Sequence, residues 1–216
     1  MASATPVPSA TLALTKITLP AGTHLHRVHL GSYGASQFNP GVKGNARFSP
    51  IKDATGSAVP TIYAATSFQA AAMETVFHDV PFAAGLKTMD MAKLDGQAYS
   101  TLQTSRDFVL ADLCQVALRK LGISRAELID TEKASYPDTR LWAIAIHTQF
   151  PDVEGLFWVS RQDDSARALV LFGDRIKAND LTQIGSPRSL LGDMKTNALV
   201  VALSKNIGVS LMTPFP

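Results

Sequence analysis

The chain is poor in cysteine, in long hydrophobic runs and in clustered charge. Its 216 residues include one cysteine, Cys114, so a disulfide within the chain is excluded, and a disulfide-stapled scaffold with it. A reducing compartment fits this composition, and we expect a cytoplasmic protein. Cys114 follows Leu113 in an apolar stretch, a context that favours a buried small side chain over a nucleophile.

Several other absences narrow the class of protein. No stretch approaches the roughly 18 apolar residues of a membrane span, and the first residues lack the basic head and apolar run of a signal peptide. The 20 Lys and Arg residues are spread along the chain, which argues against a nucleic-acid-binding surface. No Gly-x-Gly-x-x-Gly or Walker-type loop is present, so any dinucleotide is held by another architecture.

Apolar side chains, by contrast, are plentiful. Hydrophobic residues make up 46% of the chain and charged residues 18%, enough for one well-buried core. Residues 1–18 are rich in Ser, Thr, Ala and Pro and predict an extended or loosely ordered arm. Residues 19–216 are then expected to form a single domain.

Hydrophobic patterning predicts an α+β fold. We expect strands at residues 23–30, 60–65, 86–94, 98–103, 108–113, 155–160 and 168–172, and helices at 66–77, 113–121, from 124, 138–146 and 193–206. Strands and helices that come in runs without strict alternation indicate α+β rather than a doubly wound parallel sheet. The Gly-, Ser- and Asn-rich stretch 31–45 is predicted to be a long loop, and such loops in compact domains are often functional.

A glutamate on the helix after strand 60–65 is the sharpest single candidate. Thr66 with Gln69 three residues later predicts a capping box at the start of this helix, which places Glu74 in its middle. The preceding turn offers Ala70 and Ala71, small residues that leave room for a ligand. Glu74 is either an ordinary exposed glutamate or a carboxylate that stabilises positive charge at a reacting sugar carbon.

Two arginines are candidates for binding an anion. Arg27 alternates with apolar residues in a strand, so it needs a partner, either an internal carboxylate or a ligand. Arg47 follows the glycine-rich loop and precedes Phe48, a setting that suits a bidentate grip on a diphosphate. The alternative for Arg47 is a solvated loop arginine.

Tyr63 and Ser160 complete the candidate set. Tyr63 lies in the strand before the helix and is either a core aromatic or a group that stacks on a flat ring. Ser160 ends an apolar strand, where its hydroxyl is placed to bind ribose or phosphate. His24, His26 and His29 do not share one strand face and no acidic or cysteine cluster accompanies them, so we expect no metal site. A Ser-His-Asp triad has little support, because no Gly-x-Ser-x-Gly elbow is present.

Together these segments resemble the RES family, which is named for its Arg, Glu and Ser. The resemblance spans roughly residues 22–176 and rests on five ordered segments. They are Leu25-His26-Arg27, Gly44-Asn45-Ala46-Arg47-Phe48-Ser49-Pro50, Ile62-Tyr63-Ala64-Ala65 with the helix to Glu74, Phe108–Leu113, and Trp158-Val159-Ser160-Arg161 with Leu171-Phe172. The chain departs from the pattern at Val28, where some relatives carry tyrosine, and at Asn45, where a second glycine is common.

The resemblance implies a fold, a substrate and a partner. The fold implied is that of the ADP-ribosyltransferases, with mixed or antiparallel sheets and flanking helices around an NAD cleft. NAD is implied as substrate rather than cofactor, cleaved between nicotinamide and ribose with water, phosphate or a protein as acceptor. Many members are toxins neutralised by an Xre-type helix-turn-helix antitoxin. A self-associating chain is compatible with this, and its oligomeric state stays open.

The resemblance also implies roles for the candidate residues. Arg27 and Arg47 would bind the diphosphate, Tyr63 would stack on or orient the nicotinamide end, and Ser160 would hydrogen-bond ribose or phosphate. Glu74 would be the catalytic carboxylate, supported by Arg47 and Tyr63. The alternatives are an ADP-ribosyltransferase that modifies a protein and, in a different class, a non-catalytic module that binds a nucleotide or an antitoxin.

Overall fold

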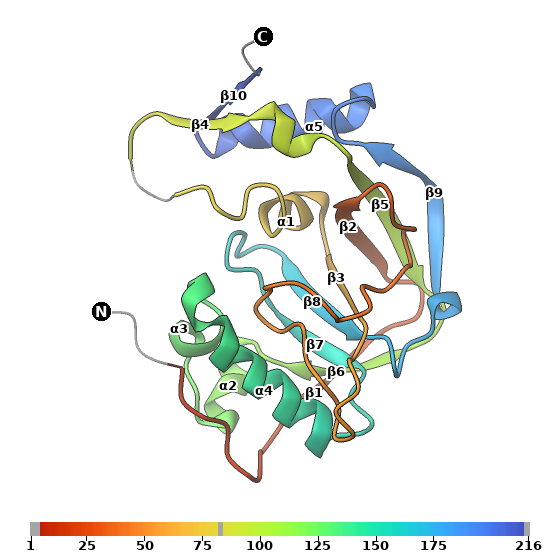
Figure 1. Cartoon of the computed structure of the whole chain (residues 1–216), viewed down its shortest axis with the longest axis vertical. Helices are drawn as coiled ribbons and strands as arrows, with labels where there is room; N and C mark the ends of the chain where they lie inside the picture. Colours follow the sequence, from red (N-terminus) through yellow and green to blue (C-terminus); the bar gives the residue numbers. More distant parts are fainter. Residues whose placement is uncertain (1–4, 82–83, 214–216) are drawn as a thin grey trace.

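A computed structural model describes residues 5–81 and 84–213 of the chain. Its main feature is an eight-stranded sheet with the strand order β1-β6-β7-β8-β3-β2-β5-β9. Neighbouring strands are antiparallel except for β6 and β7, which are parallel. The sheet curls and carries helices on its outside, as Figure 1 shows. The predicted α+β class is therefore confirmed at the level of a mixed, mostly antiparallel fold.

The bounds of the elements are as follows. The large sheet contains β1 (Lys16–Leu19), β2 (His24–Leu30), β3 (Thr61–Ala65), β5 (Gln97–Thr104), β6 (Phe108–Asp112), β7 (Gly155–Val159), β8 (Arg167–Phe172) and β9 (Leu181–Ser189). A second, two-stranded parallel sheet pairs β4 (Lys87–Asp90) with β10 (Val209–Met212). The helices are α1 (Phe68–Met73), α2 (Gln115–Leu121), α3 (Arg125–Leu128), α4 (Tyr136–Gln149) and α5 (Met194–Asn206), with 3-10 turns η1 (Met91–Leu94), η2 (Lys133–Ser135) and η3 (Ala178–Asp180).

The core follows from the apolar faces of these elements. β7 and, after its first residue Arg167, β8 are apolar and buried on both faces, because side chains pack against the sheet from each side. One cluster fills the inside of the curled sheet, and a second joins β7 and β8 to α2 and α4. A third packs α1 and α5 against β2 and β5. Figure 1 shows α4 and α5 at opposite ends of the molecule with β3 and β8 between them.

The sheet opens between β2 and β3, and this opening positions the site. β2 pairs with β5 over its whole length and β3 pairs with β8 over its whole length. Between β2 and β3, in contrast, the ladder holds the single pair His26 and Ala65. The two strands therefore separate beyond that pair, and the long loop between them returns over the gap, where Asn39 bridges to Thr61.

The structure corrects the predicted start and end of the helix that follows β3. The predicted capping box of Thr66 and Gln69 is wrong, because Ser67 is the N-cap and its Oγ accepts from the Ala70 amide at 3.0 Å. Thr66 instead extends the β3–β8 ladder, where its Oγ1 accepts from the Arg167 amide at 2.9 Å. The helix ends at Met73, so Glu74 is its C-cap and not a mid-helix residue.

Other boundaries also moved. The strand expected at 86–94 is short and gives way to η1, because the Asp90 side chain accepts from the Ala92 amide and caps a turn. The helix expected at 138–146 is longer, because α4 begins at Tyr136 after Ser135 and ends at Gln149. β1, β9 and β10 were not expected. The helices expected from 124 and at 193–206 are confirmed as α3 and α5, which have Ser124 and Asp193 as their N-caps.

The N-terminal arm packs on the domain over its described part. Leu12 and Leu14 are buried in the cluster shared with α2 and α4. The Pro6 carbonyl accepts from Trp142 Nε1 at 2.7 Å. The last residues of the predicted arm, 16–18, belong instead to β1, which lies at the edge of the sheet beside β6. The arm is thus extended, but these contacts hold it in place. Across residues 5–81 and 84–213, no helix is long and apolar enough to cross a membrane.

Candidate active site

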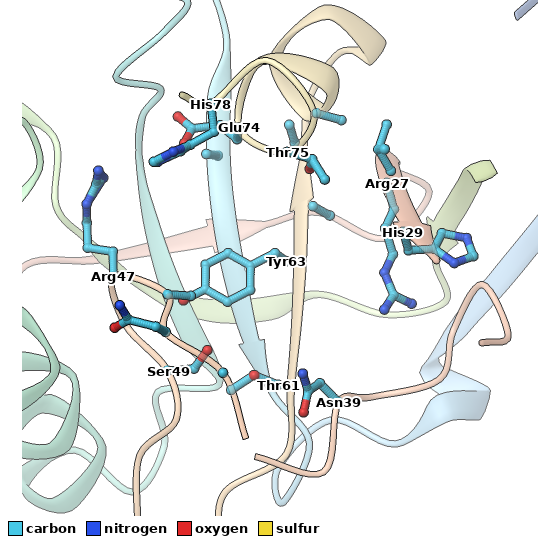
Figure 2. Close-up of a pocket in the computed structure, with 18 of the residues that line it drawn as sticks. Arg27, His29, Asn39, Arg47, Ser49, Thr61, Tyr63, Glu74, Thr75 and His78 are labelled. Atoms are coloured by element: carbon cyan, nitrogen blue, oxygen red, sulfur yellow. The ribbon is translucent and has the colours of Figure 1, made fainter. Parts of the chain in front are cut away.

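A cavity of about 420 Å³ lies where β2 and β3 separate. It is bounded by these two strands, by the loop before β3, by the end of α1 and by the start of α4. The side chains of Arg27, Arg47, Tyr63 and Glu74 all line it. Figure 2 shows the Tyr63 ring between Arg47 on one side and Arg27 on the other, with Glu74 at the end of α1. Residues distant in sequence thus meet in one concave site.

Arg47 carries a buried charge that lacks an anion. Its residue is 5% exposed, and its Nε and NH2 atoms have no hydrogen-bond partner. The guanidinium lies over the Tyr136 ring at 5.5 Å, and the Arg47 carbonyl accepts from Thr139 Oγ1 at 2.5 Å. No carboxylate in the described part of the chain forms an ion pair with Arg47. A solvated loop arginine is thereby excluded, and the unpaired donors suit an anionic ligand.

Arg27 lies on the opposite side of the cavity and holds the loop after β2. Its NH1 donates to the Gly34, Ala35 and Gln37 carbonyls at 3.3, 2.5 and 3.1 Å. Burial lowers the pKa of Arg27 to about 10, because desolvation disfavours the charged guanidinium. Arg27 has no ion-pair partner among residues 5–81 and 84–213. The alternative of an internal salt bridge is therefore not supported. The Arg27 side chain therefore brings positive charge to the cavity wall.

Tyr63 presents its ring to the cavity and keeps its hydroxyl buried. The hydroxyl oxygen accepts from the Phe48 amide at 3.1 Å, and the ring meets Trp158 edge-on with centroids 6.4 Å apart. Burial raises the pKa of Tyr63 to about 12, so the phenol is neutral at physiological pH. The ring face is then the part of Tyr63 that a flat ligand can contact.

Glu74 is fixed by one of its two carboxylate oxygens. Oε1 accepts from Ser160 Oγ at 2.7 Å and from the Arg161 amide at 3.1 Å. No described residue donates to Oε2, which leaves this oxygen for a ligand. The half-buried carboxylate is therefore oriented at the cavity wall rather than free in solvent.

Ser160 lies behind Glu74 rather than on the cavity surface. It is fully buried, and its Oγ donates to Glu74 and accepts from the Gln162 amide at 3.1 Å. It is not among the residues that line the cavity. This geometry brings Ser160 to the site as a partner of the carboxylate, whereas the sequence predicted a direct contact with ribose or phosphate.

Sequence reasoning missed a hydrogen-bonded chain of side chains along one wall. His78 Nδ1 lies 2.9 Å from Asp79 Oδ1, and His78 Nε2 lies 3.1 Å from the Tyr136 hydroxyl. Lys133 donates to Asp79 at 2.8 Å, and this bond, with that from His78, lowers the pKa of Asp79 to about 2. The sequence signal for His78 was its place four residues after Glu74, one helical turn on. The sequence contains no comparable signal for Tyr136 or Lys133.

The charges around the cavity favour an anion. Four cationic side chains line it, Arg27, Lys43, Arg47 and Lys133, against the carboxylates of Glu74 and Asp79. Asp79 is already paired with Lys133, so Glu74 alone faces the remaining cations. A ligand with net negative charge matches this distribution.

The histidines of β2 are engaged within the protein. His29 Nε2 lies 2.9 Å from Ser100 Oγ, and His26 stacks on Tyr99 and shares a hydrogen bond with its hydroxyl at 2.6 Å. Burial lowers the pKa of both histidines. No three His, Cys, Asp or Glu side chains in the described part of the chain are grouped closely enough to hold a metal ion.

Fold and site together define an α+β protein with a cationic ligand cavity at a split in its sheet. A family model for the RES domain matches residues 24–190, and the chain belongs to the RES domain family. The match begins at β2 and ends just after β9, so it contains every side chain described around the cavity. No curated protein matches the chain. Membership of the RES family is consistent with a toxin-like, NAD-related module.

Proposed function

We propose that this protein binds NAD in the cavity and breaks the bond between nicotinamide and ribose. The observation that carries the proposal is the buried Arg47 guanidinium without a partner, in the same cavity as a carboxylate fixed by one oxygen. An unpaired buried cation is costly unless an anion arrives, and a diphosphate supplies one. Arg27 would bind the diphosphate from the other side.

The chemistry follows from the remaining side chains. The C1′–N bond breaks and its electron pair goes to the nicotinamide ring, which leaves as a neutral molecule. Positive charge develops on the ribose, and Glu74 Oε2 is placed to stabilise it. Tyr63 would stack on or orient the nicotinamide ring. The acceptor oxygen then bonds to C1′ and loses its proton to solvent or to a cavity group.

This proposal includes an ADP-ribosyltransferase-like relationship of the fold. Support comes from the split between β2 and β3, which places a polar cleft inside a mixed sheet. NAD enters as substrate and not as a resident cofactor. As a toxin-like module, the protein would be neutralised by an Xre-type helix-turn-helix antitoxin, and depletion of NAD would arrest growth. An ADP-ribosyltransferase that modifies a protein and a non-catalytic binding module remain the competing functions.

Product analysis tests the proposal. Purified full-length protein is incubated with NAD, with and without inorganic phosphate, and the products are separated by chromatography. Free nicotinamide with ADP-ribose indicates water as acceptor, and phosphorylated ADP-ribose indicates phosphate. Nicotinamide release that needs an added cell extract, with ADP-ribose attached to protein, supports the transferase. NAD binding without any product would establish the non-catalytic module instead.

A further inference from the structure

An arginine outside the cavity holds the chain segment that fixes Glu74. Arg125, the first residue of α3, donates from NH1 to the Val159 carbonyl at 3.1 Å and from NH2 to the Ser160 carbonyl at 3.0 Å. Its Nε donates to Asp130 at 3.0 Å, which fixes the guanidinium plane. The Arg125 guanidinium therefore holds the end of β7 through two charge-assisted hydrogen bonds to consecutive carbonyls.

A second arginine anchors the next residue of the same segment. The Arg161 side chain donates to the Thr131 carbonyl at 2.9 Å and forms an ion pair with Glu132 at 2.5 Å. Its backbone amide donates to Glu74 Oε1. Residues 160 and 161 thus contact Glu74 on one side and the α3–η2 segment on the other.

The segment needs such an anchor because the ladder ends beside it. β7 stops at Val159, and the chain then runs through the polar loop 161–166 before β8 begins. Within this loop, the Ser160 amide donates to the Ala166 carbonyl at 3.1 Å. Arg125 supplies a link from this loop to a different element. It does not line the cavity, and no described contact joins it to Glu74 directly.

We propose that Arg125 is a positioning residue for Glu74, acting through the Ser160 carbonyl and the Ser160–Arg161 backbone. This inference rests on the proposed NAD cleavage. With the Ser160 hydroxyl and the Arg161 amide held in place, Oε1 is fixed and Oε2 keeps one direction toward the ribose. Preorganised groups of this kind act on the transition state, so Arg125 supports kcat rather than NAD affinity.

Steady-state kinetics of Arg125→Lys and Arg125→Met test this role. Lysine keeps the charge but cannot make the paired contact. We expect kcat for nicotinamide release to fall about 10- to 100-fold in both variants, the cost of a small misplacement, with KM for NAD unchanged within about twofold. Arg119→Met is the matched control, because Arg119 is an exposed arginine on the neighbouring α2. Full kcat in Arg125→Met would overturn the positioning role.

A double-variant cycle separates positioning from general loss of structure. In a Ser160→Ala background the hydroxyl contact to Glu74 is already gone. Adding Arg125→Met to Ser160→Ala should then lower kcat by a clearly smaller factor than Arg125→Met does in the wild type, because both changes act on the same carboxylate. Equal costs in the two backgrounds would show that Arg125 acts elsewhere.

Amide hydrogen exchange tests the link without relying on activity. In the wild type, the Arg161 and Gln162 amides are bonded to Glu74 and Ser160 side chains. Arg125→Met should speed exchange at these two amides and leave the Leu169 amide of β8 unchanged. Unchanged exchange at both amides in a folded variant would overturn the inference. If Arg125→Met does not fold, the same exchange measurement is made on Arg125→Lys. A wild type without NAD turnover would instead reject the proposed function, while the exchange result still decides the link.

Discussion

At the scale of single residues, Arg47 places a buried guanidinium in the cavity wall without an ion-pair partner among the described residues. Its guanidinium is buried, and its Nε and NH2 have no partner, so the folded protein bears the cost of an uncompensated charge. The Tyr136 ring offsets part of that cost through a cation–π contact. Under the proposed function, the missing partner of Arg47 is the diphosphate of NAD.

We predict that Arg47→Met weakens NAD binding at least about tenfold and leaves thermal stability equal or higher. Methionine keeps most of the side-chain volume and removes the desolvated charge. Calorimetric titration with NAD and a thermal melt of the free protein measure the two effects. Arg140→Met is the control, because Arg140 bonds to Asn45 near the same loop but does not line the cavity. A variant that binds NAD as the wild type does would remove Arg47 from the site.

We predict that Glu74→Gln lowers the rate of NAD cleavage by about two to three orders of magnitude, the usual cost of losing a key electrostatic contact. The amide oxygen can still accept from Ser160 and Arg161, so the fold and NAD affinity should be retained. Nicotinamide release is the measurement. Asp138→Asn, at an exposed carboxylate on α4, is the matched control. More than about a tenth of wild-type activity in Glu74→Gln would show that Glu74 is not the catalytic carboxylate.

At the scale of elements, β2 forms a wall of the cavity and contains one buried histidine, His29. His29 is 7% exposed and lies in hydrogen-bond contact with Ser100 and the Leu30 carbonyl. Burial lowers its pKa from the ordinary value of 6.5, and the charge of Arg27 adds to the effect. A positive charge on His29 would therefore be unfavourable in the folded strand. The same strand carries Arg27 into the cavity, so loosening β2 should loosen the site.

We predict that acidification from pH 7 to pH 5 destabilises the protein through β2. A group whose pKa is lowered in the folded state binds fewer protons there than in the unfolded chain. Its stabilising contribution is therefore fully present above the unfolded pKa of 6.5 and is lost progressively as pH falls from there through the lower folded pKa. Thermal melts at several pH values measure this, and the slope should be shallower in His29→Gln than in the wild type. Identical slopes would show that His29 does not contribute.

The short helix α1 illustrates how a neighbouring strand decides a helix end. Threonine is a residue type common at N-caps. The Thr66 hydroxyl, however, accepts from the Arg167 amide of β8, and the Thr66 amide donates to the Arg167 carbonyl. Ser67 then becomes the cap, and the helix is shifted by one residue. The same helix ends at Met73, and the carboxylate of its C-cap residue Glu74 accepts from Ser160 and Arg161 at the end of β7.

At the scale of the whole molecule, the cavity is formed by elements that are far apart in the sequence. β2, β3 and α1 bring Arg27, Tyr63 and Glu74, whereas α4 and the end of β7 hold the groups around them. The described N-terminal arm packs on α4, where the Pro6 carbonyl accepts from Trp142, and does not line the cavity. The site therefore depends on a complete domain rather than on a detachable segment.

We predict that expression of this chain alone in bacteria lowers cellular NAD and halts growth, and that Arg47→Ala relieves both effects. The reason is the proposed cleavage of NAD in the cavity, for which Arg47 supplies an anion contact. Cell density and extracted NAD are measured together after induction, with Arg140→Met as the control. Growth arrest with unchanged NAD would reject depletion and favour modification of a cellular protein.

The sequence by itself determined the apolar strands, the α+β class and the candidate side chains. Alternation in residues 23–30 and the apolar runs of β7 and β8 reflect local chain periodicity, which any packed sheet of this kind must satisfy. Polar residues within or beside such strands were therefore visible as candidates before any contact was known. Arg27 in β2 and Tyr63 in β3 belong to this group, and Glu74 was visible on the helix that follows β3.

Only the tertiary structure decided how those candidates are used. The bond between Ser160 and Glu74 joins residues 86 positions apart, and the bond between Tyr136 and His78 joins residues 58 positions apart. β9 is a mostly exposed strand with little apolar alternation of its own. It forms because it pairs with β5 at the edge of the sheet. A sequence period specifies which face of an element is apolar, but which polar groups meet depends on where strands such as β2 and β3 separate.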